Sequence, residues 1–444
     1  MIFVYGKDRF NPDKIVYWDS LKVINAHKLV LGASGTGKTT FLKSFINTIS
    51  TSYPDAVKFY VFDVHGDLDI KGDNVKHFFI SETGEYGLNP LKISPDKDYG
   101  GVRKKVKSFI STINRTSRKL GVKQEHILSE VLLELYSANG FYHDDPRTWS
   151  LDFDPRNSKY PKKYPTLKDL RRFLDAKVKQ VFLGTGHASI KALEELNKKV
   201  RLLEKYRTME IKEVSDDSKE QIKSRIDKLK EECKQLYASY IDKIETGREL
   251  DALLKYHSYD LLKSVLVYIV NLEMTGIFRD KYPSLDEDKD KNVALFKIEA
   301  LSRDEQKMFI DFYLEDIFLK SRERGLVEDV DTFIVLDEAS IFVSPDSSHI
   351  INVIIKEGRK FGIGLILASQ SLSHFSDDIL SNTSTKIILG VDETEFDTLI
   401  KKLKVTRNSL ANISPRRTAL IRQRTFDNLS NKYKTVILDY KNYN

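Results

Sequence analysis

The strongest constraint in this sequence is a glycine-rich segment at residues 32–39, which lies between an apolar run and a helix-like pattern. Gly32, four further residues, then Gly37, Lys38 and Thr39 fit the pattern G-x-x-x-x-G-K-[ST]. Glycines allow tight turns that point backbone N–H groups at an anion, and the helix that follows adds its positive dipole end. A strand–loop–helix unit that binds phosphate is therefore predicted here.

Two side chains of this loop have separate expected tasks. Lys38 would reach the β- and γ-phosphates of a nucleotide, and the Thr39 hydroxyl would complete a Mg²⁺ shell. The residues expected to contact the nucleotide are Gly32, Ser34, Gly35, Thr36, Gly37, Lys38, Thr39 and Thr40.

Apolar β-favouring runs occur in two blocks, which predict an α/β fold with one mainly parallel sheet. The runs are continuous rather than alternating, as in strands covered on both faces. The predicted first part of this core covers residues 1–95, and the second part, with the C-terminal strands, covers 279–444. A large all-α insertion is expected at 96–278.

Within this insertion, apolar residues spaced alternately four and three apart predict a charged helical hairpin at about 190–247. The charges of the hairpin are interpreted as a solvated face, with a partner-binding surface as the alternative.

Polar residues at the ends of later apolar runs predict the rest of a catalytic site. Asp337 follows one run and could hold Mg²⁺, and the next residue, Glu338, could act as general base. Gln370 ends another run and could orient water, or it could be an ordinary strand-end amide. Arg359 could stabilise the transferring phosphoryl group from across a subunit boundary, or it could be a surface arginine. Asp63 ends the run after the loop, with His65 and Asp67 close behind, and is assigned a supporting role or turn stabilisation.

Five short motifs together resemble the HerA–FtsK superfamily of P-loop ATPases, and most closely its HerA helicase branch. In chain order they read "FDVHGD", "GLNPL", "IVLDEAS", "EGRKFGIGLILASQS" and "LSNTSTKIIL". The resemblance implies a RecA-like core, a homohexameric ring, ATP bound between subunits, and double-stranded DNA in the pore.

Residue roles also follow from this resemblance. Lys38 and Thr39 match the Walker A motif, and Asp337 and Glu338 match the Walker B motif. Gln370 matches the polar sensor. Arg359 matches the arginine finger, which is donated in trans.

The chain also departs from this family. HerA proteins usually carry a β-barrel domain ahead of the ATPase, which docks partners such as the NurA nuclease. About 26 residues precede the first core strand here, so we expect this domain and its docking mode to be missing. The usual "DEAH" reads "DEAS", a change that spares both carboxylates.

A basic segment could contact nucleic acid. No acidic residue occurs between positions 102 and 123, and the net charge of the chain is +7, so a polyanionic partner is permitted. A solvated helix face or a protein-binding surface is the alternative. The candidate DNA contacts are Arg103, Lys104, Lys105, Lys107, Arg115, Arg118 and Lys119.

Three functions remain open from the sequence. The first is a motor that moves along duplex DNA without sequence specificity and works with a separately encoded nuclease or other effector, in antiviral defence or DNA processing. The second is a regulatory ATPase scaffold that assembles and gates an effector. The third is a secretion or conjugation ATPase. No stretch is long and apolar enough for a membrane span or a signal peptide, so a cytoplasmic location without membrane contact is expected.

Overall fold

A computed structural model describes residues 1–444 except 157–160, 184–186, 213–215, 243–258, 428–431 and 440–444. Its strands form one eleven-stranded sheet in the order β2-β1-β11-β10-β9-β3-β8-β7-β4-β6-β5. The strands are β1 Ile2–Asp8, β2 Ile15–Asp19, β3 Lys28–Leu31, β4 Lys58–Asp63, β5 Val75–Phe79, β6 Val293–Lys297, β7 Thr332–Leu336, β8 Ile363–Ser369, β9 Thr385–Ile388, β10 Thr418–Gln423 and β11 Lys434–Leu438.

The strands from β9 to β5 are parallel, and they form the core of the sheet. Every residue of β3, β7, β8 and β9 is buried, which explains their continuous apolar sequences. β3 lies between β8 and β9, with Leu31 opposite both Ser369 and Ile388. The predicted mainly parallel α/β fold is confirmed, and its phosphate loop begins in the middle of the sheet.

The other edge of the sheet is antiparallel and joins the two ends of the chain. β1 pairs with β2 and with β11, and β11 pairs with β10, which pairs with β9. The continuous apolar runs of the sequence did not identify β1. Exposed and buried residues largely alternate in β1, because one face of this strand is solvated. Its sequence therefore lacks the continuous apolar run of the core strands.

Helices cover both faces of the sheet. The α1 residues Phe41 and Phe45 belong to one apolar core, and the α9 residue Phe309 belongs to the core on the opposite face. The α-helices are α1 Lys38–Ser52, α2 Val102–Thr116, α3 Val122–Ala138, α4 Leu167–Leu183, α5 His187–Lys212, α6 Asp216–Asp242, α8 Tyr259–Met274, α9 Arg303–Arg324, α10 Ile350–Glu357, α11 Asp377–Asn382, α12 Phe396–Leu403 and α13 Arg407–Ala411. Single 3-10 turns are η1 Pro146–Trp149, η2 Ala339–Ile341, η3 Gly358–Phe361 and η4 Glu393–Glu395.

Helices α2 to α8 lie between β5 and β6, where the sequence predicted the all-α insertion. α2 and α3 pack against the sheet domain, and Val106 and Phe109 of α2 belong to the same core as α9. Thr166 caps α4, because its Oγ1 accepts a hydrogen bond from the Asp169 backbone N–H at 3.2 Å.

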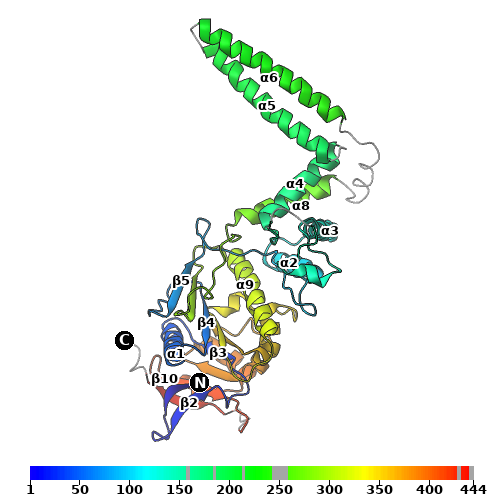
Figure 1. The fold of residues 1–444 in the computed structure, drawn as a ribbon. Coiled ribbons are helices and arrows are strands. Elements are labelled where there is room, and N and C mark those ends of the chain that lie inside the picture. Colours follow the sequence, from blue (N-terminus) through cyan, green and yellow to red (C-terminus); the bar gives the residue numbers. More distant parts are fainter. Residues whose placement is uncertain (157–160, 184–186, 213–215, 243–258, 428–431, 440–444) are drawn as a thin grey trace.

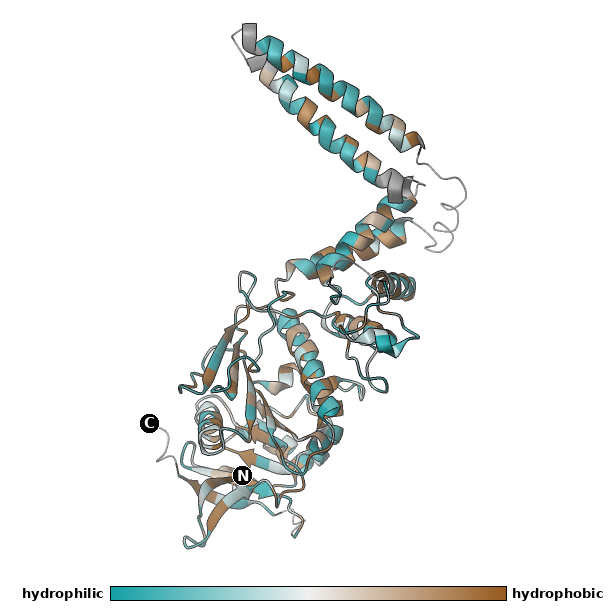
Figure 2. Cartoon of the chain, in the orientation of Figure 1, coloured by the Kyte–Doolittle hydropathy of each residue, from teal (hydrophilic) through white to brown (hydrophobic). Residues whose placement is uncertain are grey.

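Helices α5 and α6 form an antiparallel pair that projects away from the sheet (Figure 1). Both are largely hydrophilic (Figure 2), and Leu203, Ile226 and Leu229 are among the few buried apolar residues of the pair. Of the predicted hairpin at 190–247, residues 213–215 and 243–247 lie outside the described residues. No helix in the described part of the chain combines the length and apolar character needed to cross a bilayer.

An unusual buried amine lies on β3, three residues before the end of this strand. The Lys28 side chain is fully buried, and its Nζ lies 3.5 Å from the centre of the Trp18 ring and 4.7 Å from that of Phe45. Among the described residues Nζ has no hydrogen-bond partner. Burial therefore lowers the pKa of Lys28 well below its ordinary value.

Replacing this amine should stabilise the fold. The unfolded chain binds a proton that folded Lys28 does not, so the free energy of unfolding should rise with pH toward the ordinary lysine pKa of about 10.4. Lys28→Met should flatten this rise and add roughly 1–3 kcal/mol at neutral pH. Urea unfolding at two pH values measures both effects, with Lys7→Met, at an exposed position of β1, as the control. Equal pH slopes in wild type and Lys28→Met would contradict the assignment.

Candidate nucleotide-binding site

The phosphate loop has the backbone geometry that its glycines predicted. Gly35 and Gly37 adopt left-handed conformations, with φ of 77° and 103°, and Gly37 is the N-cap of α1. A Cβ on Gly32 would lie 2.4 Å from Thr36 Oγ1, so only glycine fits there. The Ala33 backbone N–H donates to Gly390 O at 2.8 Å, which ties the loop to the end of β9.

Two of the predicted catalytic residues, Glu338 and Gln370, converge on Lys38 of this loop. Lys38 Nζ lies 3.1 Å from Glu338 Oε1, and Gln370 Nε2 donates to the same oxygen at 2.8 Å. Lys38 and Glu338 are 8% and 9% exposed, so their charges interact away from bulk water. Glu338 has a left-handed backbone, with φ of 51°, which is strained for a residue with a side chain. The fold thus holds a carboxylate and an amide next to the expected position of the phosphates.

Three aspartates beside Lys38 could hold a metal ion. One carboxylate oxygen each of Asp63, Asp67 and Asp337 lie within 4.8 Å of one another. Asp63 is fully buried and accepts hydrogen bonds from the backbone N–H groups of Gly66 and Leu68, at 2.8 and 3.1 Å. Thr39 Oγ1 lies 3.4 Å from Asp67 Oδ2. Hydroxyl and carboxylate oxygens suit Mg²⁺.

Burial raises the pKa of two of these carboxylates, Asp337 and Asp63. The pKa of Asp337 is raised to about 6, first by burial and then by the charges of Glu338 and Asp67. Burial also raises the pKa of Asp63, although the hydrogen bonds from Gly66 and Leu68 oppose the shift. A cation among these groups would relieve their mutual repulsion.

A cavity of about 240 Å³ opens between the loop and these side chains. Gly32, Thr36 and Asp63 are not among the residues that line this cavity. The lining consists of Ala33, Ser34, Gly35, Gly37, Lys38, Thr39, Thr40, His65, Asp67, Asp337, Glu338, Gln370 and Arg416.

Arg359 is not among the residues that line this cavity. It is exposed in η3, directly before β8, whereas Gln370 directly follows β8. The two residues therefore lie near opposite ends of strand β8. The Arg359 guanidinium lies 5.2 Å from the centre of the Phe426 ring.

Sequence reasoning missed Arg416 and gave Asp67 no role of its own. The Arg416 backbone N–H donates to Thr36 O at 3.2 Å, and its Nε donates to Gly35 O at 2.9 Å. The contact between Arg416 and Gly35 joins residues 381 positions apart, so the sequence gives no local sign of it beyond the two arginines before β10. Asp67 had a clearer signal, as the second acid in "FDVHGD".

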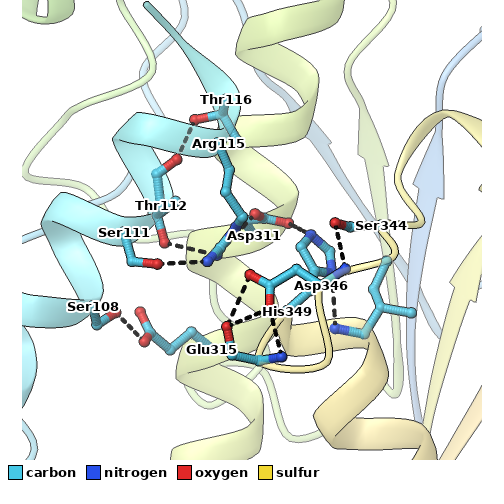
Figure 3. Close-up of polar contacts among 12 residues, drawn as sticks. Ser108, Ser111, Thr112, Arg115, Thr116, Asp311, Glu315, Ser344, Asp346 and His349 are labelled. Carbon is cyan, nitrogen blue, oxygen red and sulfur yellow. Dashed lines mark hydrogen bonds and ion pairs between the residues drawn. The ribbon is translucent and has the colours of Figure 1, made fainter. Parts of the chain in front are cut away.

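Two of the seven candidate DNA contacts are engaged inside the protein. Arg115 turns toward α9, where its Nη2 lies 3.4 Å from an oxygen of Asp311, which is 3% exposed (Figure 3). His349 Nε2 lies 3.1 Å from the other oxygen of Asp311. Lys105 pairs with Glu315 at 3.4 Å. The candidates with exposed side chains are Arg103, Lys104, Lys107, Arg118 and Lys119.

The raised pKa of Asp337 predicts a pH-dependent Mg²⁺ requirement. A proton on Asp337 would compete with the metal, so Mg²⁺-supported nucleotide binding should weaken as the pH falls through about 6. Titrating Mg²⁺ against a fluorescent ATP analogue over this range measures the effect. Asp337→Asn should lose both the Mg²⁺ dependence and this part of the pH dependence. Because the nucleotide titrates in the same way with both proteins, the difference between their pH profiles reports on Asp337. Identical pH profiles for the two proteins would count against Asp337 as a ligand.

Comparison with known proteins finds relatives of parts of this chain, and one match includes the phosphate loop. The profile of the FtsK/SpoIIIE family matches residues 6–71. The DNA double-strand break repair helicase HerA of Sulfurisphaera tokodaii is 31% identical over 117 residues, which are 24% of this chain and 24% of that protein. The HerA of Pyrococcus furiosus is 44% identical over 62 residues, 13% of this chain and 11% of that one. These matches thus span about a quarter or less of those relatives.

Solved structures extend the likeness in fold to nearly the whole chain. VirB4 of Thermoanaerobacter pseudethanolicus has a TM-score of 0.64 at 15% identity, covering 99% of this chain and 97% of that one. The plasmid coupling protein TrwB, in complex with ADP and Mg²⁺, has a TM-score of 0.50 at 12% identity, covering 94% and 86%. The sequence matches and the geometry of the loop agree: residues 6–71 are similar to the FtsK/SpoIIIE family, and part of the chain is similar to HerA helicases.

Proposed function

We propose that this protein hydrolyses ATP with Mg²⁺ at the loop 32–40, and that the hydrolysis drives movement on double-stranded DNA. The observation that carries the proposal is the convergence of Lys38, Glu338 and Gln370 at the phosphate loop. A loop that only bound a nucleotide would not need a buried carboxylate and an amide at the same point.

Each residue has a task in this proposal. The loop N–H groups and Lys38 bind the phosphates, and Thr39 and Asp337, with Asp67 beside them, hold Mg²⁺, which neutralises charge on the phosphates. Glu338 takes a proton from the attacking water, and Gln370 holds this water or the carboxylate in position. Asp63 supports the cluster through its buried hydrogen bonds.

Movement on DNA is supported by the curated relatives and by exposed cations on α2 and in the segment that follows it. Both HerA relatives are named as DNA repair helicases, and a further relative, 30% identical over 139 residues, is the DNA import protein CedB of Sulfolobus acidocaldarius. The exposed cations Arg103, Lys104, Lys107, Arg118 and Lys119 provide a sequence-independent surface for phosphates. We further propose a homohexamer acting with a separately encoded nuclease or other effector, in antiviral defence or DNA processing.

Steady-state ATPase rates with and without duplex DNA test the proposal. Wild type should hydrolyse ATP faster with DNA, and the stimulation should shrink as salt rises. Glu338→Gln should lower both rates by at least about a hundredfold, because the base is lost, yet should still bind ATP. Hydrolysis indifferent to DNA would instead support a scaffold that gates an effector, and stimulation by an unfolded protein would support a secretion ATPase.

The position of Arg359 predicts complementation between subunits. Because Arg359 lies away from its own cavity, Arg359→Ala should bind ATP normally and lose hydrolysis by about 10³-fold or more. Mixing Arg359→Ala with Glu338→Gln should restore part of the activity, since some interfaces then contain both intact residues. Lys360→Ala, the neighbouring exposed cation, is the control and should hydrolyse like wild type. Mixed rings without recovery would remove the support for action in trans.

A further inference from the structure

The segment 414–417 lies directly on the phosphate loop. The backbone N–H of Arg416 donates to Thr36 O at 3.2 Å, and its side-chain Nε donates to Gly35 O at 2.9 Å. Gly390 lies between the two segments, and a Cβ there would be 3.2 Å from Thr36 Cγ2 and 3.6 Å from Pro415 Cγ. The loop, the end of β9 and the approach to β10 therefore form one packed unit.

Arg416 is held in an unfavourable conformation at this point. Its φ of 62° is in the left-handed region, which is unfavourable for a residue with a side chain. Such strain persists where surrounding contacts impose it, and it clusters at ligand sites. Glycine would remove the strain, whereas arginine contributes a charge at the mouth of the cavity.

The guanidinium of Arg416 retains donors for a ligand. In the part of the chain that the structure describes, it forms no ion pair, and its one hydrogen bond uses Nε. The four N–H donors on the two terminal nitrogens remain. Arg416 is one of the residues that line the cavity, together with Lys38. A planar fork of this kind matches the oxygens of a phosphate.

We propose that Arg416 contacts the phosphates of the bound nucleotide, as a cation supplied by the same chain that supplies the phosphate loop. The inference rests on the proposed function, because it requires a nucleotide at residues 32–40. It differs from the role of Arg359, which would act on a nucleotide held by another copy. Nucleotide affinity should therefore depend on Arg416 whether or not subunits assemble.

The test is the Kd of a fluorescent ATP analogue with Mg²⁺, measured at a protein concentration at which wild type is monomeric. Arg416→Gln keeps a donor for Gly35 O but removes the charge and the fork, and it should raise Kd about tenfold. Arg417→Ala is the matched control, because Arg417 is exposed and adjacent and its backbone N–H bonds only to Ser414 O. It should bind like wild type. Thermal unfolding of each variant verifies that the fold is retained.

Other outcomes would overturn the inference. Wild-type affinity in Arg416→Gln would mean that the side chain only braces the loop through Gly35 O. Equal losses in Arg416→Gln and Arg417→Ala would mean a general effect of positive charge. Lys38→Ala separates the two levels of the argument: if it also binds like wild type, the proposed nucleotide site itself fails. If only Arg416→Gln binds like wild type, the site stands and Arg416 is removed from it.

Discussion

The site depends on the hydrogen bonds that fix the phosphate loop in the middle of a parallel sheet. Gly32 N–H donates to Ser369 O on β8, and Ala33 N–H donates to Gly390 O after β9, so both neighbouring strands hold the loop where β3 ends. Parallel strands present their carboxyl ends at one edge, so the residues after β4, β7 and β8 reach this loop. Asp67, Glu338 and Gln370 come together for this reason.

Close packing of like charges follows from this placement. Asp63, Asp67 and Asp337 lie near one another, Glu338 is the next residue, and Lys38 provides the nearby buried positive charge. Burial of Asp63 and Asp337, together with the neighbouring negative charges, raises the pKa of both carboxyl groups. The excess negative charge of these carboxylates would favour a divalent cation, because the cation would neutralise it.

Much of this architecture could be predicted because its signals are local. Continuous apolar runs identify buried parallel strands, and the spacing of Gly32, Gly37 and Lys38 identifies the loop. Contacts between distant segments leave no such signal. The pairing of β1 with β11, the turn of Arg115 toward Asp311, and the approach of Arg416 to Gly35 all depend on tertiary packing. A basic run in the sequence therefore could not show which of its cations face solvent.

Strand β10 connects the surroundings of the phosphate loop with those of Arg359. Arg416 lies just before its first residue, and Phe426, which packs against Arg359, lies just after its last. Its six residues extend for about 20 Å between hydrogen-bonded neighbours on both sides, so the strand is stiff along its axis. The fold thus fixes the distance between the cavity at the phosphate loop, where Arg416 lies, and Arg359 near the other end of the strands.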